Sequence, residues 1–139
     1  MRIAVALCVI TLGAASVPAA TPSAAPEGPA ESAALAWLGL IDGGNYAQSW
    51  SSAASLFRQK VSESQWQSAV SGTRAPLGAL KSRTLRSAAL KSALPGAPDG
   101  QYVVIQFDSS FEHKASAVET VTPMLDTDGH WHVSGYYIR

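Results

Sequence analysis

The spacing of apolar residues between positions 29 and 77 predicts three helices. The first extends from about Pro29, a residue suited to the first turn of a helix, to Ile41, and Trp37 lies off its apolar stripe. The third ends at the Ala75-Pro76 pair, since a proline disfavours helical geometry in the residue before it. The second carries apolar residues at intervals of three and four, on one helical face: Tyr46, Trp50, Ala53, Ala54 and Phe57.

Glycines and polar residues mark the ends of these helices. Gly43 and Gly44 follow the first apolar run, and a glycine there allows the left-handed turn that closes a helix. Asn45 stands at the N-cap position of the second helix. Ser62 and Gln65 form the S-x-x-Q pattern of a capping box, which predicts that the third helix begins at this pair.

After Gly78 the pattern changes and predicts four strands, over residues 81–91, 102–107, 118–125 and 131–138. The strand at 102–107 is apolar on both faces, which is typical of a central strand. Pro123 predicts a bulge or an edge position, because proline cannot donate to a neighbouring strand. The sequence Asp126-Thr127-Asp128-Gly129 predicts a short hairpin loop before the last strand.

The order of charges indicates which strands are neighbours. The first strand and its approach are basic, whereas the following strands are mainly acidic, so opposite charges would attract across an antiparallel pair. The basic residues are Arg74, Lys81, Arg83, Arg86 and Lys91. A nucleic-acid patch is the alternative, but this stretch has no aromatic residue on which a base could stack. We therefore expect the first strand to lie beside the second.

Together these elements predict an α+β domain, with three N-terminal helices packed on a curved four-stranded antiparallel sheet. The same order of elements is found in the cystatin-like and NTF2-like cone folds, in which a curved sheet and helices across its mouth enclose a pocket.

The N-terminus has the pattern of a secretory signal peptide. A short, positively charged N-terminal segment is followed by an apolar run and then by small residues. Two positions, after Ser16 and after Ala19, fit the pattern of a cleavage site. We divide the chain into a signal peptide (1–19), a proline- and alanine-rich tether that we expect to be disordered (20–28) and one domain (29–139). The apolar run is too short to cross a membrane. We therefore expect a periplasmic or secreted protein without a transmembrane segment.

Composition excludes several classes of function. The chain has ten Lys and Arg and ten Asp and Glu, and removal of Arg2 with the signal peptide would leave nine basic residues. This balance gives no reason to expect nucleic acid as a partner. Cys8 is the only cysteine and would leave with the signal peptide, so disulfides and zinc–thiolate sites are excluded from the processed chain. We expect no cofactor.

The chain resembles the bacterial family known as domain of unknown function 4019, over nearly its whole length after the tether. The resemblance implies an exported or envelope location in a Gram-negative bacterium and brings no established activity. It rests on several short motifs: Ala36-Trp37-Leu38, Asp42-Gly43-Gly44-Asn45-Tyr46, Ser49-Trp50, Val61-Ser62, Gln65-Trp66, Arg74-x-Pro76-Leu77-Gly78, Leu94-Pro95-Gly96-x-Pro98-Asp99-Gly100-x-Tyr102 and Asp128-Gly129-x-Trp131-x-Val133-x-Gly135-Tyr136.

Aromatic residues are the main candidates for a binding site, although core packing is the simpler explanation for most of them. Arg74 would anchor an anionic group, or would instead hold helix to strand through Asp42, Asp108 or Glu119. Another pattern, Asp128 with His130 and His132, is more typical of exposed side chains beside a turn than of a metal site, and we expect no metal. The residues that we expect to line a ligand-binding cleft are Tyr46, Trp50, Arg74, Tyr102, Glu119 and Tyr136.

We therefore expect a non-enzymatic domain that binds a protein or a small apolar or anionic ligand, with no catalytic residue assigned. The alternative is a cofactor-free isomerase, hydratase or lyase that uses Asp108 or Glu119 with a tyrosine. An enclosed pocket holding a carboxylate would favour the enzyme. A third possibility is self-association through an exposed strand edge, and we expect either a monomer or a weak homodimer.

Overall fold

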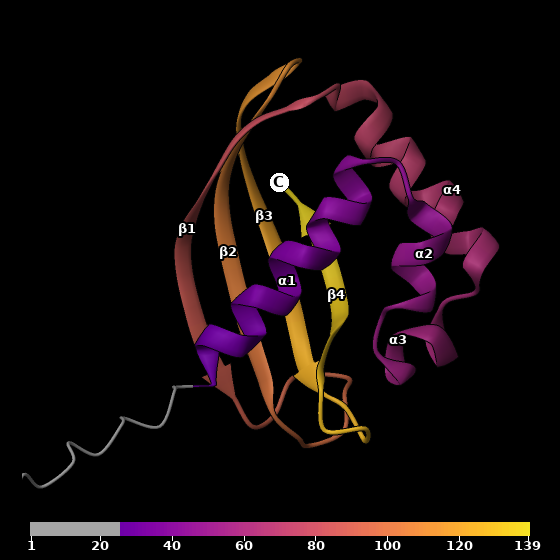
Figure 1. Ribbon diagram of the computed structural model, residues 1–139, viewed down its shortest axis with the longest axis vertical. Helices are drawn as coiled ribbons and strands as arrows, with labels where there is room; N and C mark the ends of the chain where they lie inside the picture. The colour runs from indigo at the N-terminus through magenta and orange to yellow at the C-terminus, as the bar shows by residue number, and fades with distance from the viewer. Residues whose placement is uncertain (1–25) are drawn as a thin grey trace, which may run out of the picture.

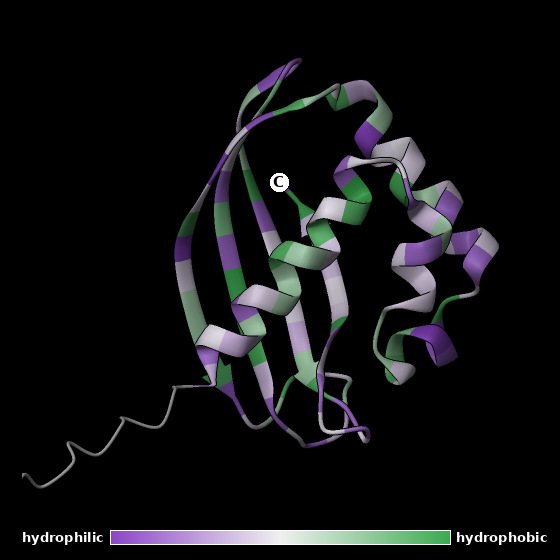
Figure 2. Ribbon diagram, in the orientation of Figure 1, coloured by the Kyte–Doolittle hydropathy of each residue, from purple (hydrophilic) through white to green (hydrophobic). Residues whose placement is uncertain are grey.

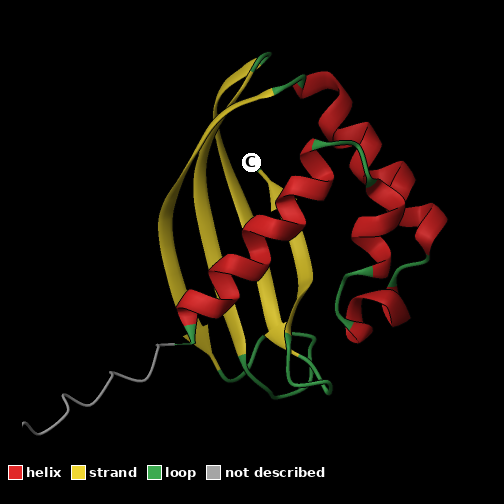
Figure 3. Ribbon diagram, in the orientation of Figure 1, coloured by secondary structure: helices red, strands yellow, loops and turns green. Residues whose placement is uncertain are grey.

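The computed structural model describes residues 26–139 as four α-helices, one short 3₁₀ helix and one antiparallel sheet of four strands (Figures 1 and 3). The helical elements are α1 (Glu27–Asp42), α2 (Tyr46–Ser51), α3 (Ser55–Lys60), α4 (Glu63–Arg74) and η1 (Ala75–Leu77). The strands are β1 (Leu80–Lys91), β2 (Tyr102–Phe111), β3 (Lys114–Leu125) and β4 (Trp131–Ile138). The predicted α+β class and four-stranded antiparallel sheet are confirmed. The signal peptide and most of the tether lie outside the described residues.

The sheet is a meander in the order β1-β2-β3-β4, so the predicted pairing of the first two strands is confirmed. Arg86 of β1 pairs with Asp108 of β2 at 3.4 Å, which is the cross-strand attraction that the charge order predicted. A register shift between Thr122 and Pro123 confirms the predicted bulge, and it lies in the interior strand β3 rather than at an edge. Both green and purple bands are visible on β2 (Figure 2), and its residues Val103, Ile105 and Phe107 belong to the core.

The prediction of three helices was wrong, because the segment expected as one second helix forms α2 and α3. Ala54 has extended geometry (φ −59°, ψ 149°), and its N–H donates a hydrogen bond to the carbonyl of Val133 in β4 (2.8 Å) instead of to a helix carbonyl. The sheet therefore interrupts the helix at a point where the apolar spacing continues. Of the predicted caps, Ser62 and Gln65 form the full capping box, whereas the Asn45 side chain makes no cap hydrogen bond.

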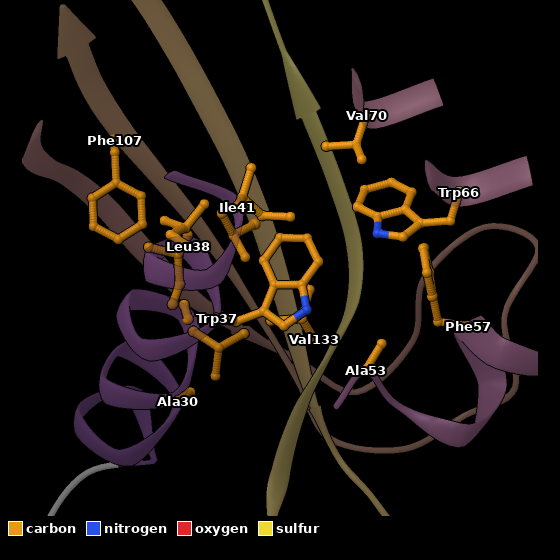
Figure 4. Close-up of a cluster of buried hydrophobic side chains, with 14 residues drawn as sticks. Ala30, Trp37, Leu38, Ile41, Ala53, Phe57, Trp66, Val70, Phe107 and Val133 are labelled. Atoms are coloured by element: carbon orange, nitrogen blue, oxygen red, sulfur yellow. The ribbon is translucent and has the colours of Figure 1, made fainter. Parts of the chain in front are cut away.

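The core lies between α1 and the sheet and continues between β4 and the other helices. Figure 1 shows α1 lying diagonally across one face of the sheet, with α2, α3 and α4 gathered beside β4. Figure 4 shows the two parts of this core. Leu38, Ile41 and Phe107 pack between α1 and the sheet, and Phe57 of α3 and Trp66 of α4 pack on the other side of β4.

The expectation that Trp37 lies off the apolar stripe was wrong, since only 4% of it is exposed. Its indole N–H donates to the carbonyl of Ser49 (2.8 Å), and its ring contacts Trp66 and Tyr136 at centroid distances of 5.8 and 5.4 Å. Because α1 packs against α2 as well as the sheet, its buried arc is wider than one stripe.

Candidate functional site

A fully buried carboxylate, that of Glu119 in β3, is the centre of a polar cluster in the core. Its side chain has no exposed surface, and it accepts four hydrogen bonds. Arg83 donates through Nε (2.7 Å) and Nη2 (3.1 Å), Ser109 through its hydroxyl (2.6 Å) and Tyr136 through its hydroxyl (2.5 Å). A buried carboxylate is tolerated when its charge is paired and its oxygens are hydrogen-bonded, and both conditions hold here.

Arg83 of β1 extends the cluster to the end of α1. Its Nη1 and Nη2 donate to the two oxygens of Asp42 at 2.8 and 3.0 Å, and Nη2 of Arg74 adds a third hydrogen bond at 2.9 Å. Burial alone would raise the pKa of Asp42, but the two guanidinium groups outweigh it and hold that pKa below its usual value. Burial would likewise lower the pKa of Arg83, and its hydrogen bonds with Asp42 and Glu119 raise it instead. The cluster thus joins α1, α4, β1 and β3.

Arg74, at the end of α4, is 5% exposed and faces the ring of Phe111, with its guanidinium carbon 4.8 Å from the ring centroid. Its Nε and Nη1 have no hydrogen-bond partner in the structure, so the aromatic ring carries part of its stabilisation. Of the three carboxylates predicted as partners for Arg74, the structure brings Asp42 into contact. The sequence analysis did not identify Arg83 as a site residue. The available signal was its position two residues before Leu85 in the first strand, which places both side chains on the same face of the sheet.

The hydrogen bond between the Tyr136 hydroxyl and the Glu119 carboxylate determines the protonation state of the tyrosine. Burial, and then the charge of Glu119, raise the pKa of the Tyr136 hydroxyl above its ordinary value. The hydroxyl therefore remains protonated and donates to Glu119. The Glu119 side chain itself has no exposed surface, so its carboxylate contacts the other members of the cluster and not solvent.

A cavity of about 340 Å³, which we call the loop pocket, lies between α3, β4 and the loop that joins β1 to β2. Its volume is at the small end of the range of about 300–1,000 Å³ that is typical of ligand sites. The lining is largely apolar, with one cation: Leu56, Phe57, Lys60, Val61, Leu94, Pro95, Gly96, Ala97, Tyr102, Thr122, Ser134 and Gly135.

Two contacts hold the loop over this pocket. The Lys60 ammonium donates to the carbonyl of Gly96 (2.8 Å), and the hydroxyl of the buried Tyr102 donates to the carbonyl of Pro98 (2.6 Å). Gly96 has φ +75°, a left-handed conformation that favours glycine and turns the loop back toward α3. Lys60 is exposed and has donors to spare, so it can also meet a ligand at the mouth of the pocket.

A second cavity of about 350 Å³, the α1 groove, lies between α1 and β4. It is lined by Ala33, Ala36, Trp37, Leu40, Ser52, Trp131, His132 and Val133. His132 is its one ionisable residue, and both ring nitrogens are engaged: Nε2 lies 2.7 Å from Asp128 and Nδ1 lies 3.2 Å from the carbonyl of Ser52. The backbone N–H of His130 and the side chain of His132 lower the pKa of Asp128. Among residues 26–139, no three His, Cys, Asp or Glu side chains are grouped so as to hold a metal.

The six residues predicted to form one cleft lie in three places. Arg74, Glu119 and Tyr136 meet in the buried ion cluster. Tyr46 and Trp50 of α2 are half-buried against the core, where the Trp50 indole donates to the carbonyl of Val61 (2.8 Å). Of the six predicted residues, Tyr102 is the one that lines the loop pocket.

Within residues 26–139, no helix is long and apolar enough to cross a membrane. A family model described as "Protein of unknown function (DUF4019)" matches residues 33–136. No curated protein matches the chain.

Proposed function

The chain belongs to the DUF4019 family of proteins of unknown function, and from that premise we propose that it is a non-catalytic binding domain of the bacterial envelope. Its proposed ligand is a small amphipathic molecule with an apolar body and one anionic group. The proposed site is the loop pocket.

The observation that carries this proposal is the combination of an apolar lining with one cation at the edge. Leu56, Phe57 and Leu94 contribute aliphatic and aromatic surface, and transferring an apolar body onto such surface is favourable. Lys60 supplies the positive charge, and a charge-assisted hydrogen bond would orient the anionic end of the ligand. The α1 groove has no comparable free charge, since His132 is engaged by Asp128 and by Ser52.

The enzyme alternative has weaker support. Glu119 and Tyr136 would be its acid and base, yet Glu119 has no exposed surface and is neutralised by Arg83. Asp108, the other candidate, is exposed and pairs with Arg86 away from the loop pocket. We therefore assign catalysis to neither residue.

We further propose that the fold is a variant of the cystatin-like or NTF2-like cone and that the protein is periplasmic or secreted. One long helix crossing the sheet supports the first proposal, and the N-terminal pattern supports the second.

Cell fractionation with N-terminal sequencing tests the location. We expect a processed chain that begins at Val17 or Ala20, and a full-length cytoplasmic protein would contradict it.

The ligand proposal is tested by an NMR titration of the processed protein with octanoate, octanol and octylamine. We expect octanoate to shift the amide resonances of Gly96 and Gly135, with octanol weaker and octylamine weakest. Lys60→Met should weaken octanoate binding about tenfold, since the anion loses a charge-assisted hydrogen bond. Arg58→Met is the matched control, because Arg58 is an exposed cation of the same helix that does not line the pocket. Equal affinities for the three ligands, or an unchanged affinity in Lys60→Met, would refute the proposal.

A further inference from the structure

The ring of His132 in β4 lies between two oxygen atoms, and both of them can only accept hydrogen bonds. Its Nε2 is 2.7 Å from a carboxylate oxygen of Asp128, and its Nδ1 is 3.2 Å from the backbone carbonyl oxygen of Ser52. The backbone N–H of His130, and then the side chain of His132, lower the pKa of Asp128, so this carboxyl group is ionised in neutral and mildly acidic solution. Neither oxygen therefore offers a proton to the ring.

This arrangement fits the charged form of the imidazole ring. A neutral ring has one N–H donor and one nitrogen with a lone pair, whereas the protonated ring has two N–H donors. With one proton, one of the two ring nitrogens would direct its lone pair at the lone pairs of an oxygen atom. With two protons, His132 donates a hydrogen bond to Asp128 and another to Ser52 at the same time.

The hairpin between β3 and β4 places two carboxylates near His132. Asp126 and Asp128 both interact electrostatically with His132, and after the hydrogen bonds from backbone N–H groups this interaction is a further cause that lowers the pKa of each carboxyl group. The third ionisable group of the hairpin, His130, is exposed and contacts Asp128 through its backbone N–H (2.9 Å). The charge that surrounds His132 on this side is therefore mainly negative.

Charged groups are few on the other elements packed against His132 in the described part of the chain. The turn that joins α2 to α3, residues 52–54, has no ionisable side chain, and neither do the α1 residues that line the α1 groove. α3 carries its two cations, Arg58 and Lys60, in its last turn, whereas the hairpin contacts its first residue, Ser55. The partners of the ring are thus the two oxygens described above.

From this geometry we propose that His132 is a pH-sensitive latch between β4 and the turn that joins α2 to α3. In acidic solution the protonated ring donates to both oxygens and holds the turn against the sheet. As the pH rises, the ring releases one proton to solvent. The short, charge-assisted hydrogen bond with Asp128 keeps the remaining proton on Nε2, so the contact with Ser52 is the one that is lost.

The histidine contact is one of three that attach the turn and the start of α3 to β4 and its hairpin. In the second contact the N–H of Ala54 donates to the carbonyl of Val133 (2.8 Å), and in the third Asp126 accepts hydrogen bonds from Ser55. The backbone contact does not titrate, and Asp126 has a pKa of about 2. Of the three, the contact of His132 is therefore the one that changes near neutral pH.

The latch lies in the wall of the α1 groove, since Ser52 and His132 both line it. When the contact between them is lost, the turn is free to move away from β4, and the groove becomes wider. The space available to an apolar ligand in the groove then depends on pH. This inference does not depend on the proposed ligand site, because neither residue lines the loop pocket.

NMR spectroscopy of the processed protein between about pH 5 and about pH 8 tests the latch. At the acidic end we expect the ¹⁵N shifts of two protonated ring nitrogens in His132, and at the basic end those of a ring protonated on Nε2. The amide of Ala54 should lose protection from hydrogen exchange about tenfold over this range, as expected for the loss of one neighbouring hydrogen bond. A neutral His132 ring at the acidic end, a proton on Nδ1 at the basic end, or equal protection of Ala54 throughout would each overturn the inference.

Two substitutions separate the latch from other effects of pH. His132→Phe keeps a ring of similar shape without an N–H donor, so the protection of Ala54 should be low and equal at both ends of the pH range. His130→Phe is the matched control, because His130 meets Asp128 through its backbone N–H, and the pH dependence should remain. A pH dependence that persists in His132→Phe, or that disappears in His130→Phe, would assign the change to another group and overturn the inference.

Discussion

Asp126, in the hairpin between β3 and β4, caps helix α3 from outside by accepting hydrogen bonds from the N–H and hydroxyl of Ser55. Both distances are 2.8 Å, and the two residues are 71 positions apart in the sequence. The residue at the N-cap position itself, Ala54, has no side chain that could cap the helix. A six-residue helix is too short to be stable alone, so this contact and the packing of Phe57 hold it in place.

We predict that Asp126→Ala lowers the free energy of unfolding by about 1 kcal/mol, the usual effect of losing an N-cap. Urea denaturation followed by circular dichroism measures the change. Asp99→Ala is the control, because Asp99 is an exposed loop carboxylate for which the structure gives no hydrogen bond. Equal stability of the two variants would mean that the capping contact contributes nothing.

The contribution of Asp126 should depend on pH. The N–H of Ser55 is the largest cause that lowers the Asp126 pKa, to about 2 from an ordinary value of 3.8. A carboxylate whose pKa is lower in the folded state stabilises the fold above its unfolded pKa, and this stabilisation is lost as the pH falls toward the folded pKa. We therefore expect the stability difference between the wild type and Asp126→Asn to be constant from pH 5 upward and to shrink between about pH 4 and pH 2. A difference that stays constant down to pH 2 would contradict this assignment.

Loss of Arg83 should be among the most damaging changes to the fold. Arg83→Met would leave the buried Glu119 and the partly buried Asp42 without their shared cation, and breaking a buried ion pair from one side costs roughly 3–5 kcal/mol. Arg86→Met is the matched control on the same strand, where a 3.4 Å pair with both side chains more than half exposed should contribute at most about 1 kcal/mol. Thermal and urea unfolding of both variants test the contrast, and similar losses would refute it.

Ser49 joins three helices through its backbone and its hydroxyl. The Trp66 indole donates to the hydroxyl (2.9 Å), the hydroxyl donates to the carbonyl of Tyr46 (2.6 Å), and the Trp37 indole donates to the Ser49 carbonyl (2.8 Å). We predict that Ser49→Ala costs about 1–3 kcal/mol, because a buried indole N–H loses its partner. The emission spectrum of the native state should also change, since Trp66 is 7% exposed and sensitive to its polar contacts.

Much of the fold could be predicted from local patterns. The capping box at Ser62 and the bulge at Pro123 follow from residues near one another in sequence. The pairing of the first two strands follows from the opposite charges of the first strand and the strands after it. The division between α2 and α3 could not be predicted in this way. It depends on the carbonyl of Val133, which lies 79 residues beyond Ala54 and reaches it only after the sheet has formed.

The sequence alone determined the class of fold, the order of helices before four strands and the absence of thiol chemistry from all residues after Cys8, because each depends on composition or on periodicity within one segment. Only the tertiary structure decided the partners of the charged and aromatic residues. It brought Glu119 to Arg83 and Asp126 to Ser55, and it placed Tyr102 in the loop pocket, apart from the ion cluster. The physical reason is that ion pairs and hydrogen bonds act over a few ångströms, and the packing of distant segments decides which groups come that close.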